Sequence, residues 1–199
     1  MTTRTRERDK REALLRAARD VLVEKGYHAA KIDQIATRAG VAKGTYYLYF
    51  EDKREIFAEL VDGLVARIEA AIVRVDEHAD LGAQVRHNIR ATIAVLAEDA
   101  ALARIVLGPS SGLDAAFAQN VSSMHVRVVA ILSRALRDGQ ALGVVAEGDT
   151  DVLAMFAIGA LKEAVLRAAG EGAELIPARR ELLVHELARF LEQGFLRLR

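Results

Sequence analysis

Gly40 divides two short segments whose apolar residues recur with helical spacing. The first segment carries Ile32, Ile35, Ala36 and Ala39, and the second carries Val41, Tyr46 and Phe50. Glycine has no side chain, so it can adopt the left-handed backbone conformation that ends one helix and redirects the chain into the next. The spacing therefore predicts two helices that meet at a steep angle through a turn of about three residues, a helix-turn-helix.

The second of these helices carries more polar and aromatic side chains than packing requires. They are Lys43, Thr45, Tyr47 and Tyr49. The periodic pattern predicts that this helix is only about eight residues long. A short helix with so many polar tips favours contact with a binding partner.

The stretch around this turn resembles the N-terminal DNA-binding domain of the TetR family of one-component transcriptional regulators. The residues that carry the resemblance are Gly26-Tyr27, Ile35-Ala36, Ala39-Gly40-Val41, Lys43-Gly44-Thr45, Tyr47 and Phe50. It covers roughly residues 8 to 60, whereas the rest of the chain is similar to the family only in length, helicity and organisation. The resemblance implies a dimer, because two recognition helices must meet two half-sites of a double-stranded DNA operator.

The family's motif, carried over residue by residue, implies which positions face DNA. These are Lys31, Lys43, Gly44, Thr45, Tyr47, Tyr49 and Lys53, with Tyr47 and Lys53 on phosphates, while Tyr46 and Phe50 pack inward. Two positions depart from the pattern, since Lys31 stands where most members have Thr or Ser and Ala42 where they have Ser. Each departure removes a side-chain N-cap, which costs about 0.5–2 kcal/mol of local helix stability unless another group replaces it. Asp33 can partly do so through the helix dipole.

The formal net charge is zero, but the charge is unevenly distributed. Residues 1–53 hold twelve Lys and Arg against eight Asp and Glu, and residues 54–199 hold sixteen against twenty. The basic half is therefore the half with the helix-turn-helix. An N-terminal basic arm can supply salt-dependent affinity for phosphates, and its members are Arg4, Arg6, Arg8, Lys10 and Arg11. The alternative is a solvated, frayed terminus.

Helices are expected throughout the chain, because prolines occur only at 109 and 177 and no alternating strand pattern is visible. We expect an all-α protein with a helix-turn-helix domain in residues 1–53, its motif at about 31–50, and a helical ligand-binding and dimerisation domain in residues 54–199. Besides the helix-turn-helix pair, helices are predicted at about 6–25, 53–75, 81–98, 101–107, 113–142, 149–169 and 177–198. Asp52 should cap the helix that begins at 53, which is shared by both domains.

The last two predicted helices are apolar on more than one face. The apolar residues include Val152, Met155, Phe156, Ile158, Leu182, Leu187 and Phe190. Such helices must bury more than one face, so we expect a homodimer through residues 149–198, with Gly159 allowing close helix approach. The alternative is a wholly intramolecular core.

Several other chemistries are disfavoured. The segment Gly108-Pro109-Ser110-Ser111-Gly112 matches the elbow of serine hydrolases, but that elbow follows a strand and a loop is expected here. The histidines show no metal-ligand spacing and cysteine is absent, so we predict no catalytic residue, no metal and no cofactor. No membrane span is visible either, and a soluble cytoplasmic protein is expected.

The effector is expected to be a small hydrophobic compound such as a fatty-acyl derivative, a drug or an aromatic. Helical phase places Arg90, Asn120, Met124 and His125 as candidate ligand-binding residues among apolar neighbours. The predicted function is a ligand-responsive repressor that the effector releases from a palindromic operator. The alternatives are a small-molecule-binding protein or enzyme with a vestigial DNA-binding domain, and a ligand-independent DNA-binding regulator.

Overall fold

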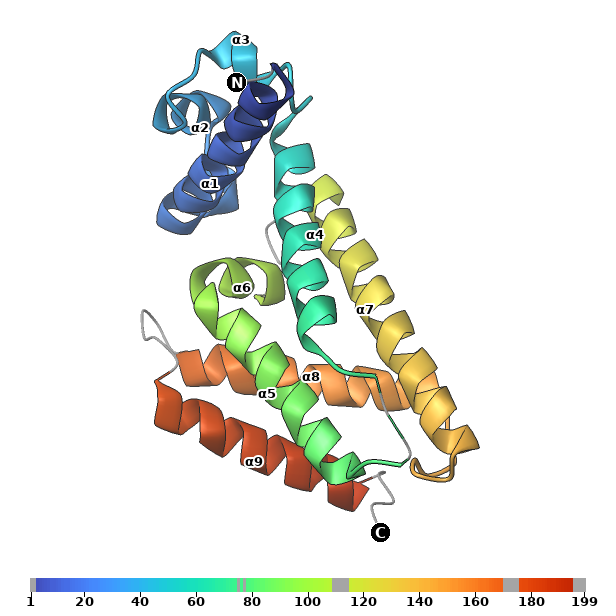
Figure 1. The fold of residues 1–199 in the computed structure, drawn as a ribbon. Helices are drawn as coiled ribbons and strands as arrows, with labels where there is room; N and C mark the ends of the chain where they lie inside the picture. The colour runs from blue at the N-terminus through green and yellow to red at the C-terminus, as the bar shows by residue number, and fades with distance from the viewer. Residues whose placement is uncertain (1–2, 75, 77, 109–114, 170–175, 195–199) are drawn as a thin grey trace.

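A computed structural model describes residues 3–74, 76, 78–108, 115–169 and 176–194. Within them the chain forms helices and no strand, which confirms the all-α prediction. The helices are α1 (Thr3–Ala29), α2 (Ile32–Arg38), α3 (Lys43–Tyr46), α4 (Lys53–Ala71), α5 (Leu81–Glu98), α6 (Ala100–Leu107), α7 (Ala115–Ala141), α8 (Thr150–Ala169) and α9 (Pro177–Gly194). Figure 1 shows α2 and α3 at one end of an elongated molecule and α8 and α9 at the other.

The turn between α2 and α3 has the predicted glycine geometry. Gly40 has a φ of +69°. The Val41 amide donates to the Ala36 carbonyl at 3.0 Å and the Gly40 amide to the Thr37 carbonyl at 3.1 Å. These two bonds form a Schellman motif, which ends α2 and turns the chain into α3.

Helix α3 is shorter than the predicted eight residues. Regular α-helix ends at Tyr46, and the next amides bond three residues back, from Leu48 to Thr45 at 3.2 Å and from Tyr49 to Tyr46 at 3.0 Å. The chain therefore tightens into a 3₁₀-like turn after the first α-helical turn. The side chains at 47–49 stay on the same exposed tip of the molecule.

The long helix α4 links two hydrophobic cores. Asp52 caps its start as predicted, since its carboxylate accepts from the amides of Arg54 at 2.7 Å and Glu55 at 3.0 Å. Phe57 in its first half belongs to a core shared with α1, α2, α3 and α6, whereas Leu64 belongs to a second core with α5, α8 and α9. The first core crosses the predicted boundary between residues 53 and 54, so α4 couples the two regions mechanically.

Helix α4 ends at Ala71 rather than at about residue 75. The Asn88 side chain on α5 holds the backbone of Val73 by accepting from its amide at 2.8 Å and donating to its carbonyl at 2.9 Å. This pair of bonds fixes an extended course directly after the helix, since Ile72 already has a ψ of 146°. The contact joins residues distant in sequence, which explains why helical periodicity missed it.

Residues 109–112 of the hydrolase-like segment, and the predicted helix ends at 113 and 198, lie outside the described residues. Across the described ranges, every helix is too short or too polar to cross a bilayer.

Candidate nucleic-acid interface

Two aromatic side chains anchor the recognition segment from inside. Tyr46 and Phe50 are fully buried in the first core, which confirms their predicted inward orientation. The Tyr46 hydroxyl donates to the Asp52 carbonyl at 2.8 Å, and burial raises the pKa of Tyr46 well above its ordinary value. The phenol therefore stays neutral and ties the tip of α3 to the start of α4.

Outside these anchors, Tyr47 and Leu48 project from the surface. The exposed fraction is 49% for Tyr47 and 80% for Leu48. Leu48 is a candidate that the sequence reasoning missed. The available signal was its position between inward residues 46 and 50, which places it on the outer side.

Lys43 at the start of α3 pairs with Asp33 in the first turn of α2. The ammonium lies 2.8 Å from the carboxylate, and the pKa of Lys43 is raised by this hydrogen bond. Both side chains are exposed, so the pair contributes little to stability. The ammonium can therefore exchange Asp33 for another acceptor at low cost.

Lys53, expected on a phosphate, has intramolecular partners in this structure. Its ammonium donates to the carbonyls of Tyr27 and of Ala30, the latter at 3.0 Å, and lies 4.3 Å from the centre of the Tyr27 ring. These carbonyls follow Gly26, where α1 leaves helical geometry with a φ of +73°. Lys53 thus caps the end of α1. Its contact with a phosphate stays a prediction, and it requires the ammonium to bind the phosphate and these carbonyls together.

The remaining predicted DNA-facing residues lie on the same end of the molecule. Lys31 is exposed just before α2, where the Gln34 side chain accepts from its amide at 3.2 Å, which is the half of a capping box that does not depend on the N-cap side chain. Gly44 is exposed and Thr45 is half-buried. Tyr49 is half-buried against the first core, so less of its ring is available than of Tyr47.

The N-terminal basic segment is helical from Thr3, and its contact with phosphates stays a prediction. It forms the first turns of α1, and Arg8 pairs with Glu12 at 3.1 Å. Arg11 pairs with Glu59 on α4 and lies over the Phe50 ring, 5.2 Å from its centre. Arg11 therefore braces α1 against α4.

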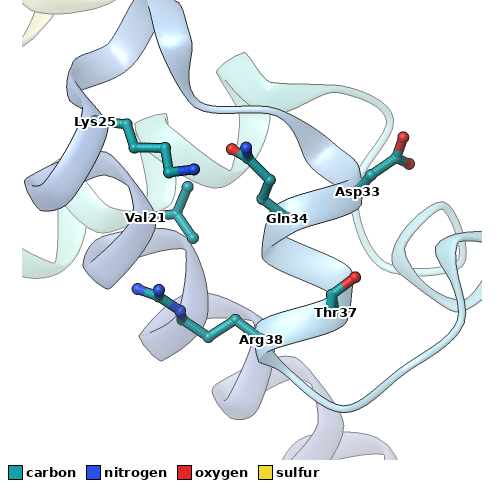
Figure 2. A pocket seen from close by; sticks show the side chains of 6 residues that line it. All are labelled: Val21, Lys25, Asp33, Gln34, Thr37 and Arg38. Carbon is teal, nitrogen blue, oxygen red and sulfur yellow. The ribbon is translucent and has the colours of Figure 1, made fainter.

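A shallow surface hollow of about 340 Å³ lies between α1 and α2. Figure 2 shows Lys25 from α1 and Arg38 from α2 reaching across it. Its other lining residues are Val21, Asp33, Gln34 and Thr37. Arg38 also pairs with Glu24 at 2.7 Å. The hollow belongs to the helix-turn-helix region and includes none of the predicted ligand-binding residues.

The predicted ligand-binding residues do not converge on one cavity among the described side chains. Arg90 is exposed on α5 and pairs with Glu181 of α9 at 2.9 Å. Met124 on α7 packs against the first core, and His125 beside it is exposed. Asn120 lies on α7, with its side chain outside the described residues. These four assignments stay predictions.

An exposed apolar face occurs on α8 and α9. Phe156 on α8 is 62% exposed and Phe190 on α9 is 54% exposed. The other large apolar side chains on these helices that are exposed are Val152, Met155 and Leu182. This face lies at the end of the molecule opposite to α3 (Figure 1).

Comparison with known proteins identifies the helix-turn-helix region. Residues 14–60 match the model of the bacterial regulatory proteins, tetR family. The N-terminal region is therefore a DNA-binding domain of the TetR type. The described helices also agree with the TetR fold, with a DNA-binding unit followed by a larger helical region.

Curated helix-turn-helix transcriptional regulators match over the N-terminal region. The transcriptional activator FasR of Mycolicibacterium smegmatis is 43% identical over 68 residues, which cover 32% of this chain and 31% of the relative. The matched stretch thus spans about a third of that relative's length.

Solved TetR-family structures match along nearly the whole chain. The fatty acid degradation regulator FadR from Bacillus halodurans is 26% identical, with a TM-score of 0.77, and the match covers 96% of this chain and 97% of that one. FadR from Bacillus subtilis, solved in complex with stearoyl-CoA, is also 26% identical, with a TM-score of 0.72 and coverage of 89% and 97%. The likeness therefore includes the region beyond the helix-turn-helix.

Proposed function

We propose that this protein is a cytoplasmic, non-enzymatic transcriptional regulator, a repressor that binds a palindromic DNA operator as a homodimer and is released by a small hydrophobic effector. The observation that carries the proposal is the recognition segment. Tyr46 and Phe50 hold it from inside, while Lys43, Tyr47 and Leu48 are left exposed at its tip. Exposed cationic, phenolic and apolar groups together suit phosphates and base edges in a major groove.

Gly44 supports a close approach of this segment to DNA. It lies inside α3, where its φ is not positive, and an added Cβ would meet no atom of the chain within 4 Å. Neither packing nor backbone conformation of the protein requires glycine there. Close contact between the α3 backbone and DNA would require a residue without a side chain at this position. The exposed Leu48 suits the methyl group of a thymine, the apolar feature of the major groove.

The apolar face on α8 and α9 supports the homodimer. Its exposed phenylalanines are of the kind that self-associating helices bury by two-fold symmetry. Dimerisation there leaves both copies of α3 free to meet two half-sites.

The direct test is selection of DNA from a random duplex pool by the purified full chain. We expect a palindrome to be enriched, with an affinity that falls as salt concentration rises, because lysine contacts with phosphate release counterions. A pool that yields no preferred sequence, or binding that is indifferent to salt, contradicts the proposal and favours a vestigial DNA-binding domain.

Tyr47→Phe is expected to weaken operator binding about tenfold per protomer, because it deletes one hydrogen bond to a charged phosphate. The free energy of unfolding should change by less than about 0.5 kcal/mol, since the hydroxyl is exposed and no packing volume is lost. The measurement is titration of the selected palindrome at fixed salt. Tyr46→Phe is the matched control, because it removes a buried hydroxyl and should lower stability rather than affinity. Unchanged operator affinity in Tyr47→Phe would contradict a hydrogen bond from the Tyr47 hydroxyl to a phosphate.

A fatty-acyl thioester is the effector class that the comparisons favour. The structure that binds stearoyl-CoA shares the fold over 89% of this chain. A ligand can release DNA only by binding more tightly to a conformation in which the two recognition helices are wrongly spaced. We expect stearoyl-CoA and the selected palindrome to weaken each other's binding by the same factor, about 5- to 150-fold.

Calorimetry of the protein with stearoyl-CoA, with and without the palindrome, measures this coupling. Coenzyme A alone is the control for the head group. Equal stearoyl-CoA affinity in both titrations overturns stearoyl-CoA as the effector that releases DNA.

A further inference from the structure

Asp99 is a buried carboxylate whose partner comes from the first helix of the chain. Its side chain is 7% exposed, and it is the only charged residue among the buried residues that the structure describes. Asp99 sits at the N-cap of α6, where it accepts from the Leu102 amide at 3.2 Å. Its charge is met by Arg19 on α1, 80 residues earlier.

The contact between Arg19 and Asp99 uses both carboxylate oxygens. Arg19 Nε donates to Oδ2 at 2.6 Å and Nη2 donates to Oδ1 at 2.9 Å. A two-bond fork fixes the orientation of both groups as well as their distance. Breaking it leaves a buried carboxylate without its cation, which is strongly unfavourable.

The fork adds to an apolar contact between the same two helices. Leu102 and Val106 of α6 lie in the first core together with Ala18 and Leu22 of α1. Ile35 of α2 and Tyr46 of α3 belong to this core as well. Movement of α6 thus reaches α1, against which α2 of the helix-turn-helix packs. Figure 1 shows α6 between α1 and the rest of the helical body.

We propose that Arg19 and Asp99 are positioning residues that lock α1 to α6 and thereby set the place of the helix-turn-helix relative to the body of the protein. This link is separate from α4, and it rests on the proposed function only for its consequence for operator spacing. With the fork closed, the two copies of α3 in a dimer have one preferred separation. With the fork open, each helix-turn-helix is held by α4 and apolar contacts alone.

The chain has no cysteine, which allows a DNA-free test by spin labelling. Labels at Thr37→Cys on α2 and Ala130→Cys on α7, both exposed positions, report the distance between the helix-turn-helix and the body within one protomer diluted with unlabelled protein. Asp99→Asn keeps the shape and the N-cap acceptor but loses the charge, and Arg19→Gln loses the fork from the other side. We expect both variants to broaden the distance distribution.

Arg67→Gln is the matched control. Arg67 pairs with Glu98, the residue before Asp99, but joins α4 to α5 without touching α1. Arg67→Gln changes the net charge as Arg19→Gln does but leaves the Arg19–Asp99 fork closed. Its distance distribution should therefore stay as narrow as that of the wild type. A thermal melt of each variant gives its unfolding midpoint. The distances are measured well below that temperature, so that partial unfolding does not broaden the distribution.

The second readout is operator spacing. The selected palindrome is compared with versions whose half-sites are one base pair closer or farther apart. Loss of the fork should reduce the spacing preference about 2- to 30-fold and leave the half-site sequence preference unchanged. Distance distributions of Asp99→Asn and Arg19→Gln identical to the wild type overturn the positioning role, whether or not DNA binds. Failure of the wild type to select DNA instead overturns only the proposed function.

Discussion

Phe190→Asp is expected to convert the dimer to a monomer and to lower operator affinity by about a hundredfold or more, because two linked recognition helices bind as one bivalent unit. Phe190 is exposed on α9, and Phe156 is exposed on α8. Burial of a carboxylate in an apolar interface without a partner is strongly unfavourable. Light scattering and titration of the selected palindrome measure the two effects.

Val126→Asp provides the control for this substitution. Val126 is exposed on α7, outside the apolar face of α8 and α9. The same change from an apolar to an acidic side chain there should leave the dimer intact. Gly159→Trp tests the interface without introducing a charge. No atom of the same chain lies within 4 Å of a Cβ added at this position, so a large side chain there should disturb the partner rather than the protomer. A dimer that persists in both Phe190→Asp and Gly159→Trp places the interface elsewhere.

Tyr46→Ala is expected to lower the free energy of unfolding by about 3–5 kcal/mol, the range for truncating a buried aromatic side chain. Tyr46 is fully buried, contacts the Phe50 ring at a centroid distance of 5.7 Å and donates to the Asp52 carbonyl. Urea denaturation followed by circular dichroism measures the loss.

The neighbouring Tyr47→Ala gives the contrast. Half of Tyr47 is exposed, so its removal should cost less than about 1 kcal/mol of stability while still weakening DNA binding. Equal loss of stability in the two variants contradicts the division of the segment into inner anchors and an outer contact surface.

The helices could be predicted closely wherever local chemistry decides them. The predicted span 81–98 coincides with α5, and Asp52 and Gly40 mark helix boundaries through their own side-chain and backbone properties. Prediction failed where the deciding contact is distant in sequence. The end of α4 depends on Asn88, which binds a backbone 15 residues earlier.

The candidate interface shows the same division. Inward Tyr46 and Phe50 follow from helical phase, and both are buried. The partners of Lys53 and Arg90 could not be inferred, because they lie 23 to 26 and 91 residues away along the chain. From their charge alone, Lys53 and Arg90 are expected to face solvent or to contact a ligand. In the folded chain they bind carbonyl or carboxylate groups instead.

The Lys53 cap has a consequence for how DNA specificity can change. Lys53 is the first residue of α4, and it binds the carbonyls of Tyr27 and Ala30 at the end of α1. Residues 31–52 therefore leave the scaffold and return to it at almost the same point. A segment closed in this way is an exchangeable cassette, provided that its inward anchors are kept. Grafting a different outer surface onto residues 43–49 should redirect the protein to a new operator while α1 and α4 keep their arrangement.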